Sequence, residues 1–383
     1  MNQSFSFSVP TVVRFGHGVS DSVPDALPAG VKRVAVLRGA SGIAAATVVK
    51  ALKQAGLSVD DIACGGEPSV ASVNAIVASL AGQPIDAIVA CGGGAVLDSG
   101  KAVAFCLGHN LQLTEDFADV PQQLLEVAGP IPCIAVPTTA GTGAEVTANA
   151  VLEIRSQQAK VSLRGRALFP VAALVDPRLL PSAPTNTVLS SGLDAIVQTI
   201  ESYTSCAATP FSDVLTRPNI ALGLSALSDV LGGGGDAAWG RMAWVSLTSG
   251  LALANSGLGA AHGIASVLGG RYGAPHGALC GRLLVPVLRQ NISVAEQGSD
   301  IHARLSECAS AIADAFAPAP GGDAMSGLEA WQDAQGLPRL VAFGVAAVDI
   351  EALAVQSASA SSSRKNGVPL MPSDYEAILA AAL

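Results

Sequence analysis

The sequence predicts an α/β protein with a doubly wound, Rossmann-like parallel sheet in its N-terminal half and an all-helical C-terminal half. Short apolar runs predict strands buried on both faces, at residues 34–37, 86–91, 134–136 and 173–175. Helical patterns separate these runs, at residues 43–55, 71–82 and 96–106. Strands that alternate with helices are typical of a parallel sheet covered on both faces. Beyond residue 184 the sequence has no convincing strand pattern.

A chain of 383 residues is long for a single core, and a proline-rich segment indicates a boundary. Three prolines fall within residues 176–184, where they interrupt both helices and central strands. We expect an α/β domain at residues 1–180 and a helical domain at 181–383, with a cleft between them. The expected helices of the second domain lie at 185–230, 238–265, 277–315 and 324–335, with two more in 347–383.

Composition narrows the classes of partner. Half of the residues are hydrophobic, only 13% are charged, and the net charge is −9, which argues against nucleic acids and anionic membranes. The N-terminus lacks the pattern of a signal peptide, and no apolar run has the length of a membrane span. Seven scattered cysteines are typical of free thiols in a reducing compartment. We therefore expect a cytoplasmic protein.

Three consecutive glycines follow the second predicted strand and open a helix, at Gly92, Gly93 and Gly94. Backbone N–H groups at such a helix start can approach a pyrophosphate closely, with the helix dipole favouring its charge. A tight strand-to-helix turn explains the glycines equally well. A second loop, residues 137–147, follows the third strand and contains four threonines and two glycines. Two polar loops at neighbouring strand ends favour ligand binding over a serine- and threonine-type turn.

Asp194 lies in an apolar helical segment, where a buried carboxylate needs a partner. Two of the five histidines, His262 and His276, occur in one glycine-rich segment. If the three side chains converge, they form a divalent-metal site. Singly, each has another interpretation: a helix N-cap for Asp194, an interior histidine for His262, and a turn for His276.

Taken together and in this order, these segments resemble the iron-containing (group III) alcohol dehydrogenase family. The resemblance extends from the opening glycines Gly16 and Gly18 to the segment 366–370 near the C-terminus. It implies a nicotinamide-binding N-terminal domain, a metal-binding helical domain, and reversible hydride transfer between alcohols and carbonyl compounds. The cofactor positions that it implies are Gly92, Gly93, Gly94, Asp98, Thr138, Thr139, Thr142, Lys160 and Leu179. The metal-ligand positions that it implies are Asp194, His262 and His276.

Two residues depart from the family pattern. The fourth metal ligand of the family is a histidine one helical turn after the aspartate, and Gln198 stands at this position. An amide oxygen is a weak ligand, so we expect altered selectivity, with zinc at least as suitable as iron. A second histidine of the family, commonly assigned to proton relay, is replaced by Ser266. A serine hydroxyl does not titrate near neutral pH, so water or a ribose hydroxyl would carry the proton.

Gly39 lies in the turn after the first predicted strand, at a position where many NAD-preferring relatives carry an aspartate that binds the ribose 2′-hydroxyl. Loss of that carboxylate, with Arg38 adjacent, predicts that NADP(H) is accepted beside NAD(H) and is preferred. The expected substrate is a small alcohol or aldehyde, and the expected assembly is a homodimer or a larger homo-oligomer. Two alternatives remain: a metal-independent reductase similar to maleylacetate reductase, and a non-catalytic dinucleotide-binding protein.

Overall fold

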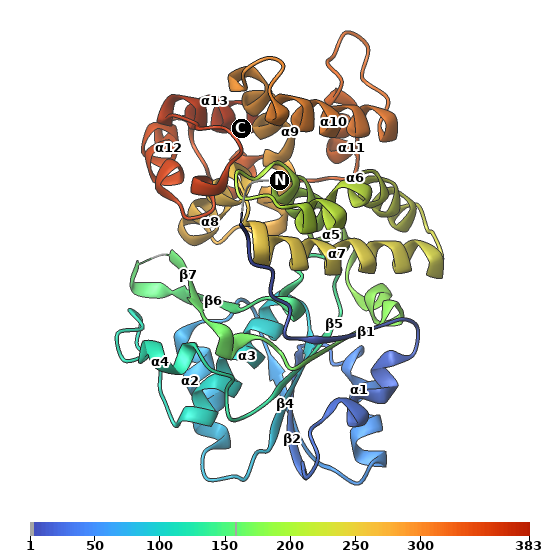
Figure 1. The fold of residues 1–383 in the computed structure, drawn as a ribbon, viewed down its shortest axis with the longest axis vertical. Helices are drawn as coiled ribbons and strands as arrows, with labels where there is room; N and C mark the ends of the chain where they lie inside the picture. Colours follow the sequence, from blue (N-terminus) through green and yellow to red (C-terminus); the bar gives the residue numbers. More distant parts are fainter. Residues whose placement is uncertain (1–3, 158) are drawn as a thin grey trace. The chain divides into compact units, whose positions relative to one another are not determined.

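The computed structural model describes residues 4–157 and 159–383, and their contacts divide the chain into two compact units (Figure 1). An α/β unit comprises Val9–Pro184. A helical unit comprises Thr185–Leu383 together with the N-terminal residues up to Ser8. Nothing in the sequence pattern had indicated that the N-terminal residues pack with the helices.

Six parallel strands form the main sheet of the α/β unit, in the order β1-β8-β5-β4-β2-β3. Their bounds are Val12–Phe15 (β1), Arg33–Gly39 (β2), Ser58–Cys64 (β3), Ala87–Gly92 (β4), Cys133–Pro137 (β5) and Ala172–Val175 (β8). The predicted parallel sheet is confirmed, and the four predicted strands are β2, β4, β5 and β8. The sequence patterns missed β1 and β3. Both lie at sheet edges, where partly exposed residues such as Asp60 and Asp61 remove the apolar signal.

Helices cover both faces of this sheet. On one face, α1 (Ala45–Gln54) packs Val48 and Leu52, and the 3-10 helix η1 (Val19–Ala26) packs Val23, into a core with Val36 and Val89. On the other face, α2 (Val70–Leu80) and α3 (Gly94–His109) pack over Ile88. The strands β2 and β4 are neighbours that lead into helices on opposite faces. Their carboxyl ends therefore form the switch point at which doubly wound sheets bind ligands.

A small antiparallel sheet, which the sequence did not predict, flanks α3. It pairs β6 (Asn149–Ile154) with β7 (Ala159–Arg164). The remaining short elements of this unit are α4 (Gln122–Leu125), η2 (Ala144–Val146), η3 (Arg155–Gln157), η4 (Arg166–Leu168) and η5 (Pro177–Ser182).

The described part of the helical unit contains helices and connecting loops, as predicted. The long helices are α5 (Thr185–Thr204), α6 (Pro210–Leu231), α7 (Asp236–Ser256), α8 (Ala260–Tyr272), α9 (His276–Val294), α10 (Asp300–Ala315), α11 (Ser326–Ala334), α12 (Ile350–Ser359) and α13 (Pro372–Ala382). Short 3-10 helices lie at Leu340–Phe343, Ala347–Asp349 and Ser363–Lys365. The N-terminal residues join this unit through Phe5 and Phe7, whose rings contact Phe211 of α6.

Three of the predicted helices were wrong as single elements, because each is two helices. The predicted helix 185–230 breaks at residues 205–209, where Thr209 forms a capping box and Pro210 starts α6. The predicted helix 238–265 breaks at Gly257, whose φ of +77° ends α7. The predicted helix 277–315 breaks before Ser299, whose side chain caps α10.

Helix α5 is buried on every face over its second half, where it packs against α6, α7 and α9. Three of its buried residues carry a carboxylate or an amide: Asp194, Gln198 and Glu201. Their spacing of four and three residues places them on one face of the helix. Since buried polar groups need partners, this face is where the helical unit concentrates its polar chemistry.

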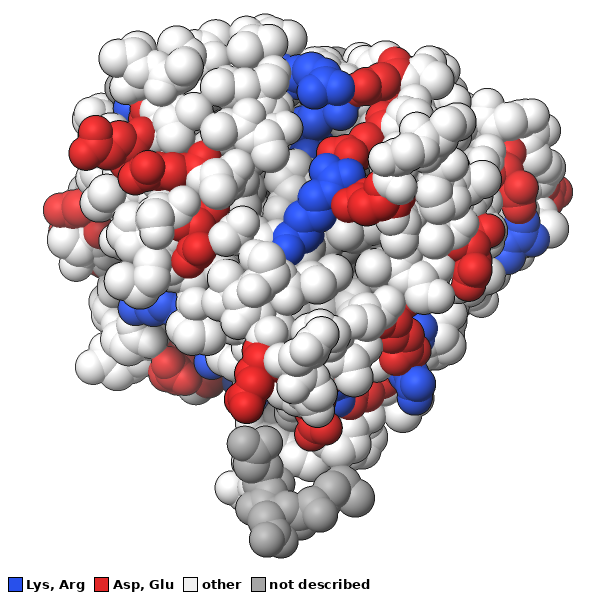
Figure 2. Space-filling model, turned by 90° about the horizontal axis from the view of Figure 1, so that it is seen from above, with Lys and Arg blue, Asp and Glu red and all other residues white. Residues whose placement is uncertain are grey.

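Figure 2 shows one face of the molecule, on which Lys and Arg side chains lie beside Asp and Glu side chains. Such intermixing matches ion pairs like that of Arg289 with Asp323 and Glu329. Among the described residues, no single helix combines the length and apolarity needed to cross a membrane. The pair α7 and α8, bent by 97°, passes that test by length and composition alone.

Candidate functional site

Four side chains from three helices converge in the helical unit. Asp194 comes from α5, His262 from α8, and His276 and Cys280 from α9. Their ligand atoms all lie within 4.8 Å of one another. The structure therefore brings together the three residues that the resemblance implied, and adds Cys280, which the sequence analysis had counted only among the scattered free thiols.

The distances inside this cluster are short. Asp194 Oδ1 lies 3.2 Å from His262 Nε2 and 4.0 Å from His276 Nε2. Cys280 Sγ lies 3.6 Å from His276 Nε2. The two imidazole centroids are 5.4 Å apart, and their planes are inclined by 57°. The four groups thus point at one small volume from different directions.

Two atoms of the cluster are buried without a hydrogen-bond partner of acceptable geometry among the described residues: Asp194 Oδ1 and His262 Nε2. Both side chains are nearly inaccessible, at 3% and 4% exposure. An unsatisfied buried polar atom is costly, so such atoms in a native fold call for an explanation. A divalent cation between them satisfies both, and carboxylate oxygen with imidazole nitrogen is a donor set suited to zinc or ferrous iron. The residues present therefore fit a metal.

Close helix packing makes the cluster possible. His276 is the first residue of α9, directly after Pro275, and Gly277 follows it. A Cβ atom on Gly277 would lie 2.3 Å from the carbonyl oxygen of Ser190 and 3.1 Å from Asp194 Cβ. Only a residue without a side chain allows α9 to approach α5 this closely. His276 is thereby held beside Asp194 at the start of α9, and the turn interpretation of His276 is wrong.

Glu201, which the sequence analysis did not identify, orients His262. Its Oε2 atom lies 2.7 Å from His262 Nδ1 and accepts the Gly259 N–H at 2.9 Å. Its Oε1 atom accepts the Ala261 N–H at 2.6 Å. The carboxylate therefore occupies the amino end of α8 and fixes the imidazole so that Nε2 faces Asp194. The position of Glu201 seven residues after Asp194, on the same helical face, is a signal that the sequence contained.

Gln198 lies beside the cluster, and its amide is already engaged. Its Nε2 donates to Asp194 Oδ2 at 3.3 Å, and its Oε1 accepts from Ser249 Oγ at 2.9 Å. The amide oxygen thus faces Ser249, not the four converging ligand atoms. In this arrangement Gln198 supports the carboxylate of Asp194.

Electrostatics favour a positive charge at this place. Burial alone would raise the pKa of Asp194, but the imidazoles of His262 and His276 outweigh it and hold that pKa below its usual value. Burial likewise opposes protonation of His262, but Cys280, Asp194 and Glu201 raise the pKa of His262 well above its usual value. The carboxylates of Asp194 and Glu201 thus place negative charge next to the imidazole of His262. Asp194 lies in the middle of α5 and is not an N-cap.

Ser266, the candidate for proton relay, lies one turn after His262 on α8. Its hydroxyl donates to the carbonyl oxygen of Gly263 at 2.8 Å. This bond is made within α8 and involves none of the atoms through which the four clustered side chains approach one another. Its catalytic role therefore stays a prediction.

The glycine loop and the threonine loop pack together in the α/β unit. A Cβ atom on Gly94 would lie 2.7 Å from Thr142 Cγ2, and one on Gly93 would lie 3.3 Å from Thr139. Thr138 N donates to the carbonyl oxygen of Gly92 at 2.9 Å, which continues the pairing of β4 with β5. Helix α3 begins here, with no side-chain cap from the described residues. An anion at the switch point would therefore face the amino end of α3, where Val96 N donates to the Gly93 carbonyl oxygen at 2.9 Å.

Lys101 of α3 connects this helix to the end of the threonine loop. Lys101 Nζ donates to the Ala144 carbonyl oxygen and to Thr147 Oγ1, at 3.0 and 3.2 Å, and pairs with Asp98 Oδ1 at 2.8 Å. The other carboxylate oxygen of Asp98 accepts the Val151 N–H at 3.0 Å. Asp98, proposed as a cofactor contact, therefore also has a structural role that links α3 to β6.

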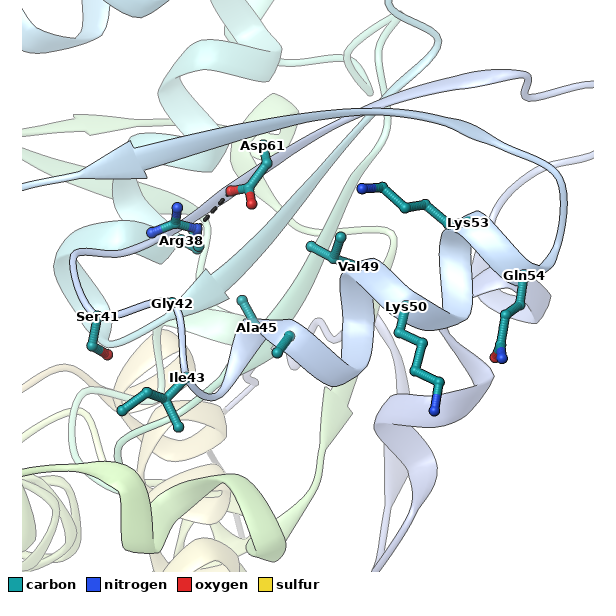
Figure 3. A pocket seen from close by; sticks show the side chains of 11 residues that line it. Arg38, Ser41, Gly42, Ile43, Ala45, Val49, Lys50, Lys53, Gln54 and Asp61 are labelled. Carbon is teal, nitrogen blue, oxygen red and sulfur yellow. Dashed lines mark hydrogen bonds and ion pairs between the residues drawn. The ribbon is translucent and has the colours of Figure 1, made fainter.

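A pocket of about 770 Å³ opens beside the end of β2 (Figure 3). Arg38, Lys50, Lys53 and Asp61 contribute charged side chains to it. Figure 3 shows Arg38 directed at Asp61, and the distance between Arg38 Nε and Asp61 Oδ1 is 2.6 Å. A Cβ atom on Gly39 would meet no atom within 4 Å. The pocket is thus open where the resemblance placed the adenosine ribose.

The last two predicted cofactor positions lie elsewhere in the α/β unit. Lys160 of β7 places its Nζ 3.2 Å from Glu67 Oε2. Leu179 is buried in the core on the α1 side of the sheet. Its segment is held by Asp176, which accepts hydrogen bonds from Gly18, Ser20 and Arg178.

Both parts of the chain match family profiles. Residues 10–177 match the profile described as "Iron-containing alcohol dehydrogenase". Residues 188–383 match the profile described as "Fe-containing alcohol dehydrogenase family, C-terminal".

Individual proteins agree with these profiles. The probable alcohol dehydrogenase EutG of Escherichia coli is 33% identical over 300 residues, covering 76% of this chain and 74% of its own. The NAD-dependent methanol dehydrogenase of Bacillus methanolicus is 29% identical, covering 91% and 92%. Among solved structures, the iron-containing alcohol dehydrogenase of Thermococcus thioreducens has a TM-score of 0.83 at 25% identity, covering 98% and 99%.

Proposed function

The chain belongs to the iron-containing alcohol dehydrogenase family, and on this premise we propose that it transfers a hydride reversibly between NAD(P)H and a small alcohol or aldehyde with the help of a divalent metal. We infer the metal from the convergence of Asp194, His262 and His276, two of which have a buried polar atom without a hydrogen-bond partner. Asp194 also argues against the metal-independent alternative, because reductases similar to maleylacetate reductase tend to have asparagine there.

Three side chains would hold the metal, and a fourth would orient them. Asp194, His262 and His276 would supply one carboxylate oxygen and two imidazole nitrogens. Glu201 would keep the Nδ1 proton on His262 and so leave Nε2 as the ligand atom. When bound, the metal supplies a Lewis acid that stabilises negative charge on the substrate oxygen. His276 is 34% exposed, so the cluster can be reached from outside on that side.

The cofactor would bind to the α/β unit at the carboxyl ends of β2, β4 and β5. Gly93 and Gly94, at the start of α3, would hold the pyrophosphate through backbone N–H groups. Thr138, Thr139 and Thr142 would contact the nicotinamide half. The packing of Thr139 and Thr142 against the glycines supports one continuous binding surface.

NADP(H) would be accepted, because Gly39 presents no carboxylate and Arg38, Lys50 and Lys53 contribute positive charge to the adjacent pocket. Asp61 opposes this preference, since its carboxylate pairs with Arg38. The test is the ratio of kcat/KM for NADPH and NADH, in the wild type and in Arg38→Ala. We expect the substitution to reduce the NADPH value more than the NADH value. A tenfold advantage of NADH in the wild type would contradict the proposal.

The decisive experiment for the function combines metal content with turnover. Purified protein is analysed by mass spectrometry for iron and zinc, and its NADPH and NADH oxidation is followed over a series of short aldehydes. Bound metal with turnover supports the proposal, and Asp194→Asn should lose both. Turnover without metal supports the maleylacetate-reductase-like alternative, and cofactor binding without turnover supports the non-catalytic one. Homo-oligomer formation and a cytoplasmic location stay predictions.

A further inference from the structure

The family's fourth ligand is missing on α5, and α9 offers a different one. Cys280 follows His276 by four residues, so both side chains leave α9 on the same face. The thiol is fully buried and is directed at the imidazole of His276, with 3.6 Å between Sγ and Nε2. It is the one sulfur among the four clustered ligand atoms in the described chain.

The distances match the geometry of a tetrahedral metal. Zinc–sulfur and zinc–nitrogen bonds of about 2.3 and 2.05 Å, at a tetrahedral angle, place the two ligand atoms about 3.6 Å apart. The observed separation of Cys280 Sγ and His276 Nε2 is 3.6 Å. The same reasoning gives about 3.4 Å for an oxygen–nitrogen pair. The observed values are 3.2 Å from Asp194 Oδ1 to His262 Nε2 and 4.0 Å to His276 Nε2, so His276 would have to move toward Asp194.

Gln198 does not compete for this position. Its amide oxygen accepts the hydroxyl hydrogen of Ser249, and its amide nitrogen faces Asp194. Turning the amide oxygen toward the cluster would require a rearrangement with Ser249. Cys280 needs no comparable rearrangement, because its sulfur already lies among the other ligand atoms.

We propose that Cys280 is the fourth protein ligand of the metal, so that the site is Asp194, His262, His276 and Cys280 on three helices. This inference rests on the proposed function, because it assumes that the cluster binds a metal. Thiolate is a soft ligand that suits zinc, and a given set of nitrogen, oxygen and sulfur ligands generally binds cobalt more tightly than ferrous iron. The loss of an imidazole on α5 is thus offset by a sulfur on α9, and the resulting site selects zinc.

The experiment is the absorption spectrum of the protein loaded with Co²⁺ alone. A tetrahedral Co²⁺ site gives visible d–d bands, and thiolate coordination adds a charge-transfer band in the near ultraviolet. We expect both in the wild type. Cys280→Ser should remove the charge-transfer band and keep the d–d bands. Cys308→Ser is the matched control, because Cys308 is equally buried on α10 but lies outside the cluster. It should keep both bands.

Affinity for Zn²⁺, measured by competition with a chromophoric chelator, gives a second readout that needs no turnover. Cys280→Ser should weaken Zn²⁺ binding by about tenfold or more, and Gln198→Ala by less than about threefold. Wild-type protein with d–d bands but no charge-transfer band would overturn the role of Cys280 and leave the proposed function standing. Wild-type protein that binds neither Co²⁺ nor Zn²⁺ would overturn both. The wild-type spectrum decides the matter even if a variant fails to fold.

Discussion

Replacement of Glu201 by glutamine tests whether this carboxylate controls the metal site. Its two oxygens accept three donors, at 2.6 Å from Ala261 N, 2.9 Å from Gly259 N and 2.7 Å from His262 Nδ1. A glutamine has one acceptor oxygen. In the better orientation that oxygen takes the Oε2 position, keeps Gly259 and His262, and turns the amide NH₂ toward the Ala261 N–H.

Two effects follow from this geometry. One buried N–H loses its acceptor, which costs about 1–3 kcal/mol of folding stability. The negative charge behind His262 also disappears, which weakens Nε2 as a ligand and should lower metal affinity about 10–100-fold. We therefore expect Glu201→Gln to fold, to melt at a lower temperature, and to bind Zn²⁺ more weakly in competition with a chelator.

The matched control is Glu307→Gln in the same unit. Glu307 accepts hydrogen bonds from Tyr203 Oη at 2.8 Å and Arg217 Nε at 2.7 Å, outside the metal cluster. Its replacement should change the melting temperature but leave Zn²⁺ affinity unchanged. If Glu201→Gln lost stability while its Zn²⁺ affinity stayed within twofold of the wild type, the orienting role of Glu201 would be refuted.

Three further predictions concern helix packing, a buried carboxyl group and the glycine loop, and two of them have a matched control substitution. Gly277→Ala should separate α9 from α5, destabilise the fold by more than about 2 kcal/mol and abolish metal binding. The matched control is Gly240→Ala in α7, where the added Cβ atom would have no atom within 4 Å. This substitution should raise the free energy of unfolding, measured with denaturant, by up to about 1 kcal/mol. Burial raises the pKa of Glu145 from 4.5 to about 7, so the folded state binds this proton more tightly than the unfolded chain. The stabilisation by the protonated carboxyl group is complete below about pH 4.5 and is lost as the pH rises through about 7. The free energy of unfolding of Glu145→Gln should therefore equal that of the wild type at low pH and exceed it at pH 8 by on the order of 3 kcal/mol. Denaturant unfolding at both pH values measures this difference. Gly94→Ala should force a threonine of the neighbouring loop to move and weaken NADPH binding at least threefold in a fluorescence titration, whereas Gly39→Ala is sterically free and should bind NADPH as the wild type does.

The strands that the sequence revealed are those buried on both faces. Residues in β2, β4, β5 and β8 form continuous apolar runs because helices cover the sheet on either side. The edge strands β1 and β3 have partly exposed residues on most positions, so their runs are interrupted. Helix breaks were missed for a different reason, since periodicity continues across a short loop when both helices bury an apolar face.

The cluster of candidate metal ligands was only partly visible in the sequence. Asp194, His262 and His276 stood in the order that the family resemblance implied, and the fold brings them together. The sequence did not predict a role for Glu201 or Cys280, because the role of a buried acid or thiol depends on which groups face it in the fold. Their spacings, seven residues after Asp194 and four after His276, become informative once the helices α5 and α9 are known.

The path of the chain between the two units has a mechanical consequence. The α/β unit, Val9–Pro184, is inserted between two segments of the helical unit, and both ends of the described chain lie in that helical unit. A single protease cut after Ser8 or after Pro184 would therefore leave the units covalently joined, and two cuts are needed to release them. A force applied at the two termini would first strain the contacts of Phe5, Phe7 and Ser8 with α6 and α7. Until those contacts yield, the sheet of the α/β unit would carry no load.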